Sequence, residues 1–85
     1  MMYLGQLLDV LDDNERVIIR SSKERSLTYV DDIPLSDART RLSKDARKCS
    51  VSNIYSDNSE KVSRETVTVI YIRPNGYLIH SRIGG

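Results

Sequence analysis

Leucines recur at helical spacing near the start of the chain. They occupy positions i, i+3, i+4 and i+7 and so share one face of a helix over residues 4–11: Leu4, Leu7, Leu8 and Leu11. Asp12, Asp13 and Asn14 follow, and such side chains bond to nearby backbone and end helices. We therefore expect a short amphipathic helix, which needs packing because a helix of this length is unstable alone.

Two strands are predicted after this helix. Residues 16–21 alternate as a strand does, with Val17 and Ile19 on one face. The other face carries Arg16, Ile18 and Arg20. The polar residues 22–25 predict a hairpin loop, and residues 27–30 predict the returning strand. We expect residues 31–34 to end that strand, because Pro34 has no N–H to donate to a ladder.

A second helix is predicted from Ser36 to about residue 48. Ser36 is a favourable N-cap, and Asp37 suits the positive end of the helix dipole. The apolar stripe of this helix is thin and consists of Leu35, Ala38, Leu42 and Ala46. We therefore expect the helix to lie on the protein surface.

The rest of the chain favours strands. Residues 51–55 predict a weak strand and residues 56–60 a loop. Residues 66–72 predict a strand most strongly, because they are β-branched or aromatic at every position. Turn-forming residues at 73–76 precede a last predicted strand over residues 77–80, so the C-terminal quarter predicts a hairpin.

The predicted architecture is a single α+β domain over residues 1–85. We expect an antiparallel sheet of four to five strands and two short helices, in the order helix, strand, strand, helix, strand, strand, strand. A chain of 85 residues suffices for one modest core. Because the chain has five tyrosines but no Phe or Trp, we expect marginal stability or help from self-association.

Charge is segregated along the chain although it nearly balances overall. Lys and Arg number 13 against 12 Asp and Glu, and the net charge of +1 argues against a general polyanion binder. Residues 1–15 carry four acids and no base, whereas residues 16–48 carry nine bases against five acids. We therefore expect a dipolar surface with a basic middle.

A single cysteine and a single histidine exclude several kinds of site. Cys49 has no partner for an intramolecular disulfide, and with His80 alone it cannot build a Cys/His zinc site. Neither a calcium-binding loop nor a phosphate-binding glycine loop is present. We expect no metal, no cofactor and no catalytic residue, so the chain predicts a protein that is not an enzyme. A nucleophilic pair of Cys49 and His80 is the enzymatic alternative.

The chain shows neither a secretory signal nor an apolar segment long enough to span a membrane. We expect a cytoplasmic protein without a membrane partner.

The second predicted helix carries most of the candidate binding residues. Its basic side chains spread over a broad face opposite the apolar stripe: Arg39, Arg41, Lys44, Arg47 and Lys48. They fit an acidic protein partner or nucleic-acid phosphates, and further candidates to extend the patch are Arg16, Arg20, Lys23 and Arg25. The alternative is an ordinary solvated helix, whose positive charge is partly offset by Asp37 and Asp45. Tyr71 and Tyr77 flank the predicted hairpin turn and are the aromatic candidates for a contact with a partner.

The C-terminal residues Ser81-Arg82-Ile83-Gly84-Gly85 resemble the tail of ubiquitin-like and sulfur-carrier proteins. That resemblance implies a β-grasp fold and adenylation of the terminal carboxylate. The chain departs from the family in two ways, since it opens with a helix and its two glycines follow the last predicted strand almost at once.

Residues 4–20, with a Leu-Leu-Asp helix, an acidic turn and a Val-Ile-Ile strand, resemble the start of small phage- and prophage-encoded accessory proteins of unassigned function. This resemblance covers the first 20 residues and the rest only in pattern. It implies a context in which small proteins bind and inhibit or modulate a host protein, as anti-CRISPR and other anti-defence proteins do.

The leading hypothesis is therefore a non-enzymatic protein that binds a protein partner in the cytoplasm, which is the host cytoplasm for a phage protein. One alternative is nucleic-acid binding by the basic helix, and another is a ubiquitin-like carrier ending in Gly84 and Gly85. A homodimer is also considered, formed by an exposed edge strand over residues 77–83 or 27–30.

Overall fold

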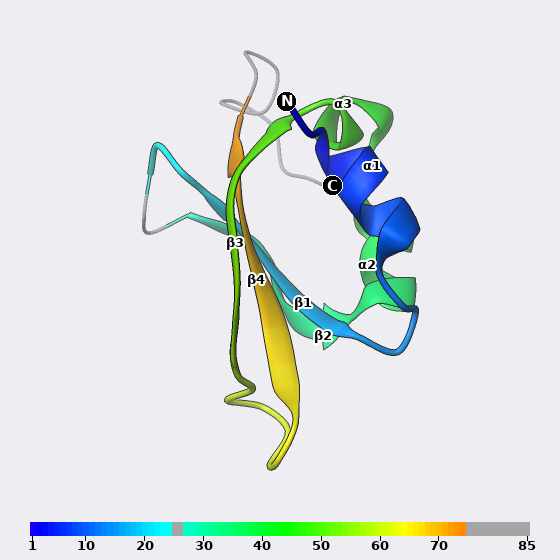
Figure 1. Cartoon of the computed structure of the whole chain (residues 1–85), viewed down its shortest axis with the longest axis vertical. Coiled ribbons are helices and arrows are strands. Elements are labelled where there is room, and N and C mark those ends of the chain that lie inside the picture. Colours follow the sequence, from blue (N-terminus) through cyan, green and yellow to red (C-terminus); the bar gives the residue numbers. More distant parts are fainter. Residues whose placement is uncertain (25–26, 75–85) are drawn as a thin grey trace.

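The protein is described by a computed structural model over residues 1–24 and 27–74. In chain order the elements are α1 (Leu4–Val10), β1 (Arg16–Ser21), β2 (Thr28–Pro34), α2 (Leu35–Arg41), α3 (Lys44–Arg47), β3 (Ser50–Asn58) and β4 (Thr66–Arg73) (Figure 1). The predicted α+β class is confirmed, and the described residues contain four strands and short helices in roughly the expected order. The last predicted strand, over residues 77–80, lies outside the described residues.

The sheet is mixed, which corrects the antiparallel sheet expected from the sequence. Its strand order is β2-β1-β4-β3. β1 pairs with β2 and β3 with β4 as antiparallel neighbours, but β1 and β4 run parallel, from Arg16 opposite Val67 to Ser21 opposite Ile72. The two antiparallel pairs meet through their most apolar strands, β1 and β4, because strands at the centre of a sheet are buried on both faces. β4 is paired on both edges, so the outer strands among those that the structure describes are β2 and β3.

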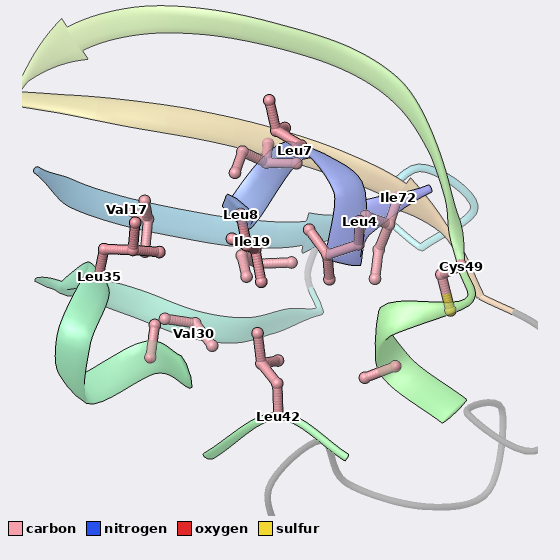
Figure 2. Packing of buried hydrophobic residues seen from close by; sticks show 13 residues of the cluster. Leu4, Leu7, Leu8, Val17, Ile19, Val30, Leu35, Leu42, Cys49 and Ile72 are labelled. Atoms are coloured by element: carbon pink, nitrogen blue, oxygen red, sulfur yellow. The ribbon is translucent and has the colours of Figure 1, made fainter. Parts of the chain in front are cut away.

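The three helices that the structure describes lie on one side of the sheet (Figure 1). The main core fills the space between the two layers, and Figure 2 shows leucines of α1 close to Ile19 of β1 and Ile72 of β4. Leu4, Leu7 and Leu8 are buried there, as the spacing predicted. A second, smaller cluster lies on the opposite face, which none of the described helices covers and which we call the helix-free face. It consists of Ile18, Val67 and Val69 with Tyr71 packed against it.

The second predicted helix is interrupted. α2 begins at Leu35 after Pro34, so Ser36 is not its N-cap. Leu42 leaves helical geometry with φ −93° and ψ 124°. Ser43 then starts α3, because its Oγ accepts a hydrogen bond from the amide of Ala46 at 3.1 Å. The predicted apolar stripe is nevertheless buried across both helices: Leu35, Ala38, Leu42 and Ala46.

Two strands are longer than their sequence patterns predicted. β2 continues through Asp31 and Asp32 to Pro34, because Asp32 adopts φ 53° and the β1–β2 register shifts between Val17 and Ile19. Asp is one of the few residues that tolerate this left-handed conformation. β3 extends to Asn58, so the loop expected over residues 56–60 begins only at residue 59.

Candidate functional site

The five basic candidates of the helical layer fall into two groups. Arg41, Lys44 and Lys48 are exposed and make no ion pair with any residue that the structure describes. Arg39 and Arg47 are only partly exposed and bond to the protein's own backbone. The predicted basic patch therefore presents fewer available cations than the sequence suggested.

Arg39 joins α2 to the end of α1. Its Nη2 donates to the carbonyl oxygen of Leu8 at 2.5 Å, and its Nη1 lies 2.7 Å from Oδ1 of Asp13. Arg47 in turn donates through Nη2 to the carbonyl oxygen of Arg39 at 2.9 Å. Carbonyls at a helix C-terminus lack partners within the helix, so these arginines satisfy backbone groups that the fold leaves open.

α1 and α3 approach closely at Gly5. A Cβ atom at this position would lie 3.2 Å from Cβ and 3.3 Å from the carbonyl oxygen of Arg47. A hollow opens beside this contact, lined by Tyr3, Gln6, Asp9, Arg47 and Lys48 together with Gly5. It brings Arg47 and Lys48 beside Tyr3, an aromatic residue that the sequence did not single out.

Tyr71 lies on the opposite side of the molecule, because it belongs to the helix-free face of the sheet. Its backbone register places it opposite Arg20 of β1 and Asn53 of β3. Its ring stacks on that of Tyr55, with a centroid distance of 6.2 Å and an interplanar angle of 24°. We call Arg20, Asn53, Tyr55 and Tyr71 the tyrosine face. The predicted residues therefore do not form one site, since the sheet separates Tyr71 from the basic helices.

Tyr55 is the most prominent member of the tyrosine face. The residue is 41% exposed, on a strand whose residues 52–58 are all exposed. A hydrogen bond with the Tyr71 side chain raises the pKa of the Tyr55 phenol, and desolvation adds to this, while the nearby charge of Arg20 lowers it. The Tyr55 phenol therefore stays neutral near pH 7 and presents a polar tip on an apolar ring.

A buried carboxylate organises the other end of the helix-free face. Asp32 is 2% exposed, and its Oδ1 lies 2.6 Å from Nε of Arg16. Ser59 donates from Oγ to Oδ2 of Asp32 at 2.6 Å, and the amide of Lys61 donates to the same oxygen at 3.4 Å. These bonds tie the β3–β4 connection to β2, beside a small pocket whose lining includes Ile18, Val67 and Val69.

Burial by itself would raise the pKa of the Asp32 carboxyl. The hydrogen bonds from Ser59, Arg16 and the Lys61 amide outweigh that effect, so the pKa of Asp32 is lowered from its usual value. Asp32 is consequently ionised at neutral pH, and Arg16 neutralises its charge. Arg16, which the sequence suggested as an extension of the basic patch, is thus largely buried and pairs with Asp32.

The outer edge of β3 is partly occupied at its start. The N-terminal segment pairs there, since Leu4 donates its amide to the carbonyl oxygen of Cys49 at 2.8 Å and Val51 donates to that of Met2 at 2.9 Å. Beyond residue 51, no described strand pairs with this edge. Ile54, 44% exposed, and Tyr55 lie in the open stretch.

The remaining candidates are placed as follows. Cys49 is buried in the main core at 1% exposure, where it acts as a small apolar residue. His80, Tyr77, Gly84, Gly85 and Arg25 lie outside the described residues. Lys23 is exposed in the β1–β2 connection. Among the described residues, no helix is long and apolar enough to cross a membrane.

Sequence reasoning missed Tyr55 and Asp32 as organising residues. Tyr55 was one of five tyrosines in a weakly predicted strand, and its stack depends on the pairing of β3 with β4. Asp32 was expected in a turn before Pro34, and its partner Ser59 is distant in sequence. The Asp31-Asp32 pair is compatible with a left-handed residue, but no sequence signal pointed to the bond with Ser59.

Compared with known proteins, the chain matches no family model, no curated protein and no solved structure.

Proposed function

We propose that the protein is a non-enzymatic binding protein that engages a protein partner through the tyrosine face. The observation that carries this proposal is the stack of Tyr55 on Tyr71, with the residue Tyr55 41% exposed. Tyrosine and arginine dominate the energetics of protein interfaces, because they bury a large area at little conformational cost. Stacking reduces that cost further, since each ring already restricts the other.

The charges beside the tyrosine face favour a protein over a nucleic acid. The neighbouring pocket is lined by Asp31, Asp57 and Glu60 as well as by Arg20 and Lys61. Non-specific nucleic-acid binding combines aromatic rings with a continuous basic groove. The three exposed cations among the predicted binding residues, Arg41, Lys44 and Lys48, belong to the helical layer, on the other side of the sheet from the rings.

The biological setting of this proposal rests on the resemblance of residues 4–20 to phage-encoded accessory proteins. In that setting the partner is a host protein that the chain inhibits or modulates. The ubiquitin-like alternative depends on Gly84 and Gly85, which lie outside the described residues, and no observation on the rest of the chain favours it.

Affinity capture from the protein's native cells tests the proposal with matched tyrosine variants. Tyr55→Ala removes the exposed ring of the tyrosine face, while Tyr3→Ala removes a ring of similar exposure, 46%, from the helical side. We expect a protein that is recovered by the wild type and by Tyr3→Ala but is lost with Tyr55→Ala. With the purified partner, Tyr55→Ala should weaken binding by about 30-fold, as for an interface hot spot.

A nuclease-treated sample runs in parallel. Loss of the captured material after nuclease treatment would support nucleic-acid binding instead. Equal recovery of the partner by the wild type, Tyr55→Ala and Tyr3→Ala would contradict binding through the tyrosine face. Equal loss of the partner with both variants would contradict it as well.

A further inference from the structure

The outer edge of β3, which no described strand covers and which we call its free edge, has sharply defined limits. At its start, the amide of Val51 is bound to Met2, so the outer edge opens at residue 52. At its end, the strand stops at Asn58. Residues 52–58 are exposed throughout, and Tyr55 lies exactly midway between the two limits.

The direction of the backbone along this edge is shown by two local hydrogen bonds. The amide of Ile54 donates to Oδ1 of its neighbour Asn53 at 2.9 Å, and the amide of Asn58 donates to Oδ1 of Asp57 at 2.8 Å. Backbone groups alternate in direction along a strand, so Ser56 shares the outward orientation of Ile54 and Asn58. Residues 54, 56 and 58 therefore present their amides to a further strand.

We infer that the free edge of β3 pairs with the same edge of a second copy of this chain, antiparallel and with the two-fold axis at Tyr55. This register opposes residue 52 with residue 58 of the copy and thus uses the whole open stretch. A register shifted to centre on Ile54 would place residue 57 of the copy opposite Val51, where Met2 already pairs. The pairing joins the two sheets into one continuous sheet, to which each copy contributes its four described strands.

The backbone orientation agrees with this register. Ile54 faces Ser56 of the second copy, and both carry outward amides, as a hydrogen-bonded antiparallel pair requires. Tyr55 faces its own equivalent in a non-hydrogen-bonded pair, where side chains come closest. The two Tyr55–Tyr71 stacks then form one row of aromatic rings across the dimer.

The side chains along the strand are self-complementary in this register. Asn53 lies opposite Asp57 of the second copy, so an amide faces a carboxylate on both sides of the axis. Asp57 is the sole charged residue of β3, and the register keeps the two Asp57 carboxylates apart. When the amides of Ile54 and Asn58 turn to the second copy, Asn53 and Asp57 are released from their own backbone and become available for this contact.

The other free edge is less suited to strand pairing. β2 shows register shifts, a left-handed residue at Asp32 and a terminal proline at Pro34. Such irregularities protect an edge strand from pairing with another chain. The homodimer considered from the sequence is therefore assigned to β3, which the sequence did not suggest as an edge.

Cysteine trapping tests both the dimer and its register on the purified protein. Opposed residues of a non-hydrogen-bonded pair lie within disulfide range, so Tyr55→Cys should form a covalent dimer under mild oxidation. Asn53→Cys should not, because its equivalents lie about 13 Å apart along the paired strands. Mixing Asn53→Cys with Asp57→Cys should restore cross-linking. The wild type is the control, since its Cys49 is buried.

Sedimentation measures the dimer without any cross-link. The wild type should double its apparent mass as its concentration rises. Ser56→Pro removes one outward amide and should hold the protein as a monomer, while Ser56→Ala keeps that amide and should dimerise like the wild type. Circular dichroism checks that Ser56→Pro is folded.

A monomeric wild type at every concentration, together with no cross-link by Tyr55→Cys, would overturn the inference. Cross-linking by Asn53→Cys alone, as efficient as that by Tyr55→Cys, would overturn the register. The inference does not rest on the proposed function, because these measurements contain no other protein.

Discussion

Nη2 of Arg39 lies 2.5 Å from the carbonyl oxygen of Leu8, so a charged side chain of α2 binds the end of α1. The same guanidinium contacts Asp13, whose side chain is 64% exposed. An ion pair that reaches solvent contributes little, so the bond to the buried backbone is the important one. A cation at a helix C-terminus also interacts favourably with the helix dipole. Arg39, expected to bind a partner, thus holds the helical layer together.

Replacing Arg39 should therefore destabilise the fold. Arg39→Ala leaves the Leu8 carbonyl without its charged donor, which should lower the free energy of unfolding by about 1.5–3 kcal/mol. Arg41→Ala is the matched control, because Arg41 is exposed, and its effect should stay within about 0.5 kcal/mol. Urea denaturation of the two variants measures the difference, and equal effects would contradict the role of Arg39.

Asp32→Asn should destabilise the protein in a pH-dependent way. The substitution keeps the shape of the side chain and tolerates the positive φ, but it leaves Arg16 without a counter-charge. Loss of one member of a buried ion pair costs about 3 kcal/mol or more, and we expect that loss at pH 7. The measurement is the free energy of unfolding of both proteins between pH 7 and pH 2.

The direction of the pH effect follows from the lowered pKa of Asp32, where hydrogen bonds from Ser59 and Arg16 overcome the opposing effect of burial. The ionised carboxylate stabilises the folded state above its unfolded pKa of about 3.9. This stabilisation is lost as the pH falls below that value and through the folded pKa. The difference in the free energy of unfolding between wild type and Asp32→Asn should therefore narrow below about pH 4. A difference that widens there would contradict a stabilising role for the ionised Asp32 carboxylate.

Ser59 should be important for the order of the β3–β4 connection. Besides donating to Asp32, its Oγ accepts from the amides of Lys61 at 3.2 Å and Val62 at 3.0 Å. Ser59→Ala should cost about 1–2 kcal/mol and speed hydrogen exchange at those two amides. Ser63→Ala, in the same connection and exposed, is the control. Unchanged exchange in Ser59→Ala would show that its hydroxyl does not order this segment.

Gly5 should resist larger side chains because of its contact with α3. One neighbour of an added Cβ would be the backbone oxygen of Arg47 at 3.3 Å, which cannot move without shifting α3. Gly5→Val should therefore lower stability by about 1–3 kcal/mol, as overpacking does. In Gly5→Ala, the helix propensity gained by removing glycine, about 1 kcal/mol, should offset part of the strain. Thermal unfolding of both variants checks this order, and Gly5→Val as stable as Gly5→Ala would contradict it.

Helices and strands that are defined by the periodicity of a short segment could be predicted from the sequence. The leucines of α1 and the alternation in β1 led to elements whose bounds the structure matches within one residue, and the leucines are buried as expected. The second helix shows the limit of such patterns. Its apolar stripe was predicted correctly, but the interruption between α2 and α3 was not. From the sequence, Ser43 could equally continue a helix or cap a new one. Leu42, at the interruption, packs into the core.

The candidate site depended more heavily on contacts between distant residues. Tyr71 was selected because it precedes a predicted turn, yet its significance comes from Tyr55, a residue of another strand. Arg39 and Arg47 belonged to a regular pattern of charge, and that pattern contains no information on which cations meet backbone carbonyls.

By itself, the sequence determined the α+β class, the first helix and strand, and the apolar stripe of the second helix, because periodicity within a short segment decides which side chains face a core. The tertiary structure alone decided the parallel pairing of β1 with β4, the burial of Asp32 beside Arg16 and Ser59, and the outer position of β3 among the described strands. These features arise from how two antiparallel strand pairs meet and how a connection folds back. Such choices depend on the free energy of the whole packed domain, which no local pattern along the chain specifies.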